Sequence, residues 1–82
     1  DATWTTSEAT LKPGDLLFLY TDGLTEARRR GHLFGEEALA KALRRHRRSR
    51  TVDLPQNILN DVLQFSGGVL QDDVAILALK RN

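Results

Sequence analysis

Two short stretches of this sequence place a carboxylate directly beside a run of apolar residues. In residues 16–23, Leu-Leu-Phe-Leu-Tyr-Thr-Asp-Gly, Asp22 follows the apolar run. The second stretch has the reverse order, because Asp72 and Asp73 come first and the apolar residues 74–79 follow. Short runs that are apolar throughout are typical of strands buried on both faces, although periodicity alone does not separate them from a buried helix.

If the two strands are antiparallel neighbours, the end of the first lies beside the start of the second. Asp22 and Asp72 then share one rim of the sheet, where carboxylates on rigid strands can hold Mg²⁺, Mn²⁺ or Ca²⁺. Asp73, Asp15 and Glu26 are further candidate ligands. The alternative is that Asp22 and Gly23 form an ordinary turn and that Asp72 caps a strand.

The composition limits the other kinds of chemistry. The chain has 82 residues and a net charge of +1, and it contains no methionine. It also contains no cysteine, which excludes disulfides and thiolate metal sites. The absence of cysteine fits a reducing cytoplasm, and no apolar run approaches the length of a membrane span. Neither His32 nor His46 lies near a serine in a nucleophile-elbow pattern, and His46 is expected to be a surface residue.

Eight of the twelve basic residues fall in two runs, at residues 28–30 and 44–50. Such runs can bind nucleic acid, but no aromatic residues are interleaved for base stacking. We therefore interpret them as a helix end that complements the helix dipole and as solvated loop, and we predict no nucleic-acid partner.

The remaining pattern predicts the elements that position these residues. Threonine-rich residues 4–11 predict a strand that ends in a turn, and residues 24–29 predict one or two helical turns. Glu36 to His46 has helical composition, with an apolar stripe of two leucines and two alanines. Asp53 is expected to cap a second helix, with Gln56 completing a capping box and Gly67 ending it. Two amphipathic helices between two buried strands indicate an α+β fold with helices on one face of the sheet.

The sequence from Leu11 to Arg28, Leu-Lys-Pro-Gly-Asp-Leu-Leu-Phe-Leu-Tyr-Thr-Asp-Gly-Leu-Thr-Glu-Ala-Arg, closely resembles the second half of the bacterial stage II sporulation protein E-type phosphatase domain. That domain belongs to the metal-dependent, protein phosphatase 2C-like superfamily. Phe-Gly-Glu at residues 34–36 and Asp-Asp-Val-Ala-Ile-Leu at residues 72–77 also match, in the same order. The resemblance covers essentially the whole chain.

The resemblance implies an α-β-β-α sandwich, mostly antiparallel, with two Mn²⁺ or Mg²⁺ ions at one end. It implies that Asp22 and Asp72 are metal ligands and catalytic residues, whereas Asp73 supports its neighbour. The implied reaction is the hydrolysis of phosphoserine or phosphothreonine by a water that the metals activate. The implied partner is a phosphorylated regulator such as an anti-sigma-factor antagonist in a stress or sporulation switch.

The chain departs from the family pattern in one respect. The family's first half carries an Asp-Gly motif whose aspartate bridges both metals, and no matching segment precedes Leu11. We therefore expect residues 1–82 to be the C-terminal portion of a single phosphatase domain that is inactive alone and self-associates. The alternatives are a non-catalytic regulatory or interaction module of the same fold and a nucleic-acid-binding module that uses the arginine runs.

Overall fold

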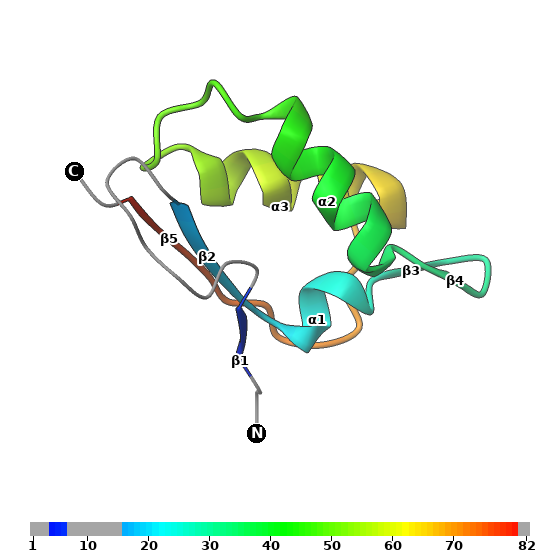
Figure 1. The fold of residues 1–82 in the computed structure, drawn as a ribbon. Helices are drawn as coiled ribbons and strands as arrows, with labels where there is room; N and C mark the ends of the chain where they lie inside the picture. The colour runs from blue at the N-terminus through cyan, green and yellow to red at the C-terminus, as the bar shows by residue number, and fades with distance from the viewer. Residues whose placement is uncertain (1–3, 7–15, 81–82) are drawn as a thin grey trace.

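The computed structural model describes residues 4–6 and 16–80 and confirms an α+β fold (Figure 1). In chain order, the elements are β1 (Trp4–Thr6), β2 (Leu16–Thr21), α1 (Asp22–Thr25), β3 (Arg28–Arg29), β4 (His32–Leu33), α2 (Gly35–Arg45), α3 (Leu54–Ser66) and β5 (Ile76–Lys80). The predicted extension of the first strand to Leu11, the turn after it and Asp15 lie outside the described residues.

The larger sheet has the strand order β1-β2-β5 and is antiparallel throughout. The central strand β2 pairs with β5, which brings together the two apolar runs of the sequence. Both long helices lie between these runs along the chain. The register places Leu17 opposite Leu79 and Leu19 opposite Leu77. The antiparallel pairing that the sequence analysis assumed for these two strands is therefore confirmed.

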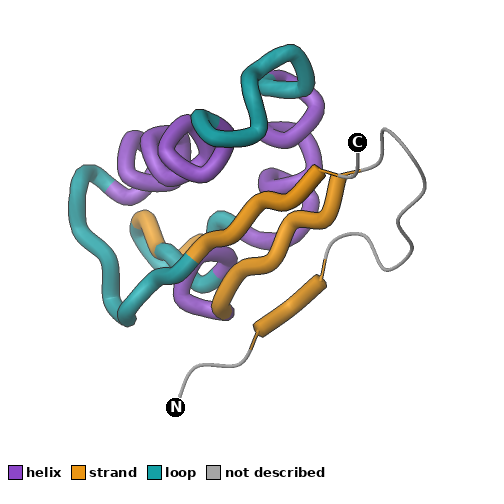
Figure 2. Tube along the Cα trace, turned by 90° about the vertical axis from the view of Figure 1, so that its left-hand side faces the viewer, coloured by secondary structure: helices purple, strands orange, loops and turns teal. Residues whose placement is uncertain are grey.

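The two faces of this sheet differ in their environment. Successive side chains of a strand point to opposite faces, so Phe18 and Tyr20 lie on the same face, and both are buried in the core. On the opposite face Leu77 and Leu79 are 45% and 46% exposed. Among the described elements the long helices lie on one face of the sheet, as predicted (Figure 2). The predicted burial of the strand on its other face is not found among the described residues.

The helices cover the sheet with the apolar stripes that their sequences predict. In α2, Leu39 and Ala42 are buried, and Leu43 packs against the core. Among the described residues, the buried apolar core consists of Phe18, Tyr20, Leu24, Ala27, Leu39, Ala42, Leu54, Ile58 and Val62. No helix in the described part of the chain combines the length and apolar character that a membrane crossing requires.

The ends of the helices follow the predictions except at the start of α3. Gly67 ends α3 in the left-handed conformation, with φ of 76°, as predicted. The predicted capping box is wrong, because Asp53 has helical backbone angles and its side chain makes no cap hydrogen bond. Its carboxylate instead accepts a hydrogen bond of 2.9 Å from Nε of Arg50, and the Gln56 amide donates to Asn60 Oδ1.

The prediction of helical turns across residues 24–29 is correct only at its beginning. The single turn α1 ends at Thr25, and β3 and β4 then form a two-stranded hairpin that projects from the body of the molecule (Figure 1). Arg30 and Gly31 connect these strands with φ of 51° and 81°. Positive φ at both central residues matches the twist of a tight hairpin, which glycine permits without strain. At its base, the Phe34 N–H donates to the Ala27 carbonyl over 2.8 Å.

Candidate metal centre

The candidate site begins where β2 and β5 stop pairing regularly. Tyr20 opposite Ile76 is the last regular pair, and one residue further on the Thr21 N–H donates to the Ala75 carbonyl over 3.1 Å. The Ala75 N–H returns a hydrogen bond of 3.0 Å to the Thr21 hydroxyl. Thr21 is only 2% exposed, so these two bonds fix the segment before β5 against a buried residue at the end of β2.

Gly23 brings the two acidic segments into direct contact. A methyl group added at this position would lie 3.3 Å from the Cβ of Asp72 and would overlap the backbone carbonyl oxygen of Asp73. Gly23 is buried in the first turn of α1, and no positive φ is involved. Glycine is therefore required here for close approach between two backbone segments, and this contact holds Asp72 beside the start of α1.

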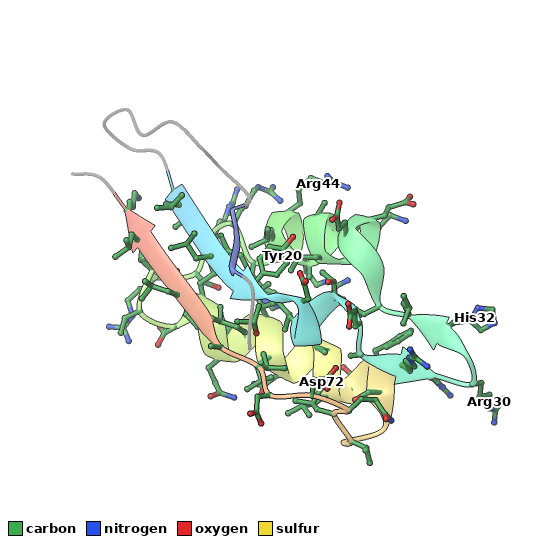
Figure 3. The ribbon with its side chains drawn as sticks, turned by 90° about the horizontal axis from the view of Figure 1, so that it is seen from below. Tyr20, Arg30, His32, Arg44 and Asp72 are labelled. Atoms are coloured by element: carbon green, nitrogen blue, oxygen red, sulfur yellow. The ribbon has the colours of Figure 1, made fainter. Side chains whose placement is uncertain are left out.

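The structure thus brings Asp22 and Asp72 to the same end of the sheet, as the antiparallel geometry predicts. Asp22 is the first residue of α1, and Asp72 lies on the segment that leads into β5 (Figure 3). Both residues are exposed, so a cation in solution can reach their carboxylates. Their backbones are held by the buried contacts of Thr21 and Gly23.

Tyr20 forms the apolar boundary beneath this end of the sheet. The centroid of its ring lies 5.9 Å from that of the Phe18 ring, and both side chains are buried. Burial raises the pKa of the Tyr20 phenol, and the nearby carboxylates of Glu36 and Asp22 raise this pKa further. Since the ordinary pKa of tyrosine is already about 10, the phenol stays neutral at physiological pH and adds no charge to the site.

The other predicted candidates take different places. Asp73 presents its backbone carbonyl to Gly23, which fits a supporting role for this residue. Glu26 is exposed at the C-cap of α1, where its N–H donates to the Asp22 carbonyl over 2.9 Å. The structure adds Thr21 as a positioning residue. Thr21 could have been identified from the sequence, because its hydroxyl side chain lies between an apolar strand and an Asp-Gly pair.

The histidines lie elsewhere. His32 is exposed on β4. The prediction that His46 is a surface residue is wrong. The His46 ring is half-buried and lies 2.8 Å from Oδ2 of Asp61, which also accepts a hydrogen bond of 2.7 Å from Arg45. These three side chains join the end of α2 to the middle of α3, which gives His46 a structural contact.

The chemistry of the donors fits a hard cation. Asp22 and Asp72 offer carboxylate oxygens, which suit Mg²⁺ and Mn²⁺ better than softer metals. Within residues 4–6 and 16–80, however, no three histidine, aspartate or glutamate side chains gather into a group that could hold a metal ion. Among the described residues, Asp22 and Asp72 can therefore contribute two of the ligands of a metal site, but they do not form a complete site.

Comparison with known proteins decides which family builds such an arrangement. A model of the stage II sporulation protein E (SpoIIE) family matches residues 1–82. The chain belongs to the SpoIIE family. Its domain is therefore of the protein phosphatase 2C-like type, and the predicted family resemblance is confirmed over the whole chain.

A curated relative supports the same assignment for this SpoIIE chain. The phosphoserine phosphatase RsbU of Bacillus subtilis (strain 168) is 30% identical over 71 residues, which cover 87% of this chain. They cover 21% of RsbU, so the chain spans about a fifth of the length of the relative it matches. No solved structure gives a significant match.

The hydroxyl of Thr21 supplies a direct test of the site's architecture in this SpoIIE chain. Thr21→Val keeps the shape of the side chain but removes the acceptor of the Ala75 N–H. We expect a loss of about 0.5–1.5 kcal/mol in the free energy of unfolding, because the Ala75 N–H loses a partly buried hydrogen bond. Urea denaturation measures this loss. Thr21→Ser, which retains the hydroxyl, is the control, and an equal loss in both variants would contradict the assigned role.

Proposed function

We propose that this chain is part of a metal-dependent phosphatase that hydrolyses phosphoserine or phosphothreonine in a regulatory protein. The observation that carries the proposal is the β2–β5 pairing, which brings Asp22 and Asp72 to one end of the sheet with Gly23 packed against residues 72 and 73. Family membership and the similarity to a phosphoserine phosphatase support the same chemistry.

In this proposal Asp22 and Asp72 hold Mn²⁺ or Mg²⁺ together with ligands from outside the described residues. When bound, two such ions supply an activated water and offset the charge of the attacking and leaving oxygens. Thr21 and Gly23 keep the two carboxylate-bearing segments in register. The neutral Tyr20 beneath them limits water on the core side, because it is buried.

The proposed substrate is a phosphorylated regulator of the anti-sigma-factor antagonist type, in the cytoplasm. This substrate class comes from the family resemblance. The relative RsbU is a phosphoserine phosphatase, which supports a phosphoserine substrate. The domain assignment is also a proposal: residues 1–82 form the C-terminal portion of one phosphatase domain.

Neutralising either aspartate tests the proposed ligands. In the full-length protein, we expect Asp22→Asn and Asp72→Asn each to lower turnover of a phosphoserine peptide by at least about a hundredfold. Even the substitution of a residue that only orients a metal ligand can lower activity by up to about a hundredfold. Both carboxylates are exposed, so circular dichroism is expected to show an unchanged fold.

Glu37→Gln provides the matched control for these variants, because Glu37 is an exposed carboxylate in the first turn of α2. Its turnover is expected to equal that of the unmodified protein. Full activity in both aspartate variants would remove Asp22 and Asp72 from the site.

The chain of residues 1–82 alone is expected to bind Mn²⁺ weakly and to show no phosphatase activity. Two carboxylates without a bridging ligand hold a divalent ion poorly, because such sites normally add waters, further carboxylates or substrate phosphate. Isothermal titration calorimetry with MnCl₂ and a phosphopeptide assay measure these properties. Turnover at the rate of the full-length protein would contradict the proposal that the site is incomplete.

The isolated chain is also expected to self-associate. Leu77 and Leu79 are about half exposed on the open face of the sheet, opposite Leu19 and Leu17, and exposed apolar faces and strand edges promote association. Sedimentation velocity is expected to show oligomers that decrease in the double variant Leu77→Lys and Leu79→Lys. A monodisperse monomer of the unmodified chain at moderate concentration would count against this proposal.

A further inference from the structure

The two arginine runs have different roles in the structure. In the second run, Arg45 binds Asp61 and Arg50 binds Asp53, so these side chains hold the connection between α2 and α3. In the first run, Arg28, Arg29 and Arg30 are all exposed, and none of them takes part in the ion pairs within the described residues. The guanidinium groups of the hairpin therefore form no ion pair within the described residues.

This charge is concentrated on a projecting element. Arg30 and His32 lie at the tip of the β3–β4 hairpin and point away from the body of the molecule (Figure 3). Arg29 pairs with His32 across the hairpin. The pairing of β3 with β4 holds Arg28, Arg29 and Arg30 on one hairpin, which costs less ordering entropy on binding than an irregular loop would.

A hollow at the base of the hairpin continues the same surface. It has a volume of about 310 Å³ and lies where the hairpin meets α2 and α3. Three cationic side chains, Arg29, Lys41 and Arg45, line it together with a single carboxylate, that of Asp61. Arg45 binds Asp61, and Lys41 lies 3.7 Å from the carboxylate of Glu37. Arg29 is therefore the lining cation whose charge is not offset by an ion pair within the described residues.

Aromatic side chains give this hollow an apolar wall. Phe34 and Phe65 both line it, and their rings meet edge to face with centroids 5.5 Å apart and an interplanar angle of 71°. A volume of about 310 Å³ is at the small end of ligand pockets and suits one or two side chains. The hollow combines an apolar wall with a cationic rim, which favours a short peptide that has both carboxylates and an apolar residue.

A continuous nucleic-acid backbone fits this surface less well. Glu36 and Glu37 occupy the first turn of α2, directly after the hairpin, and do not line the hollow. Their carboxylates repel a chain of phosphates that continues from the hairpin onto α2, whereas a short acidic segment can end before it reaches them.

We propose that the β3–β4 hairpin and this hollow form a docking surface for an acidic segment of the phosphoprotein substrate. The inference rests on the proposed function. The hairpin begins three residues after α1, whose first residue is Asp22, and the hydrogen bond between Phe34 and Ala27 ties its base to the core. The hairpin of the docking surface and Asp22 of the candidate metal centre are therefore carried by one continuous segment.

The test uses the full-length protein and two phosphoserine peptides of equal length. One peptide carries several glutamates and a leucine beside the phosphoserine, and in the other the glutamates are glutamines. Arg29→Glu is expected to raise KM for the glutamate peptide roughly fivefold, because it replaces a rim attraction with a repulsion, and to leave kcat unchanged. KM for the glutamine peptide and turnover of p-nitrophenyl phosphate are expected to stay unchanged.

Arg48→Glu is the matched control, because Arg48 is exposed and lies in the connector between α2 and α3, outside the residues that line the hollow. It makes the same charge change and is expected to leave KM unaltered. An unchanged KM in Arg29→Glu, or an equal rise in both variants, would overturn the docking proposal. Weaker binding of a DNA duplex by Arg29→Glu without a change in peptide KM would also overturn it and would assign the surface to nucleic acid.

The failure of this proposal can be distinguished from the failure of the proposed function. If the unmodified protein turns over neither the peptides nor p-nitrophenyl phosphate, the proposed phosphatase activity is wrong. Fluorescence anisotropy of the labelled peptides then measures their binding directly and tests the docking surface without requiring turnover. Tighter binding of the glutamate peptide that is lost in Arg29→Glu supports the surface, and equal binding of both peptides overturns it.

Discussion

The pairing of β2 with β5 is the constraint on which the rest of the described structure depends. It joins two apolar runs from opposite parts of the sequence and ends in the reciprocal hydrogen bonds between Thr21 and Ala75. At that point the regular ladder gives way to a side-chain hydroxyl, and the chain can diverge into α1 on one side and the segment of Asp72 on the other. A single register therefore determines both the central sheet and the position of the two carboxylates.

The helices between these strands support this pairing from one side. Leu54, Ile58 and Val62 of α3 and Leu39 of α2 fill the space above Phe18 and Tyr20. The ion cluster of Arg45, His46 and Asp61 joins the two helices near the connector. The opposite face of the sheet carries the cross-strand leucine pairs. The described residues thus form one sheet with one helical layer, which is the part of a sandwich that positions Asp22 and Asp72.

Much of this arrangement could be predicted from the sequence, because its strongest signals are local. The apolar runs, the helical stripes and the glycine after α3 gave the element types and their order, and antiparallel pairing followed for Asp22 and Asp72. The cap of α3 was mispredicted because Arg50 competes for the Asp53 carboxylate. The hairpin was missed because its turn depends on two positive φ angles and on the burial of Ala27. The contact of His46 with Asp61 depends on how α2 crosses α3, which no spacing in the sequence reveals.

The long separation between Thr21 and Ala75 has a consequence for how the site forms. The hydrogen bond between these residues closes a loop of 54 positions along the chain, whereas α2, α3 and the hairpin consist of contacts close in sequence. Loop closure has to precede the gain from such a distant pair, so local elements form faster than the central sheet does. The two aspartates come together only when the chain reaches its full topology. Partial opening of the sheet therefore separates them while the helices remain formed, and the candidate metal centre is intact only while β2 and β5 are paired.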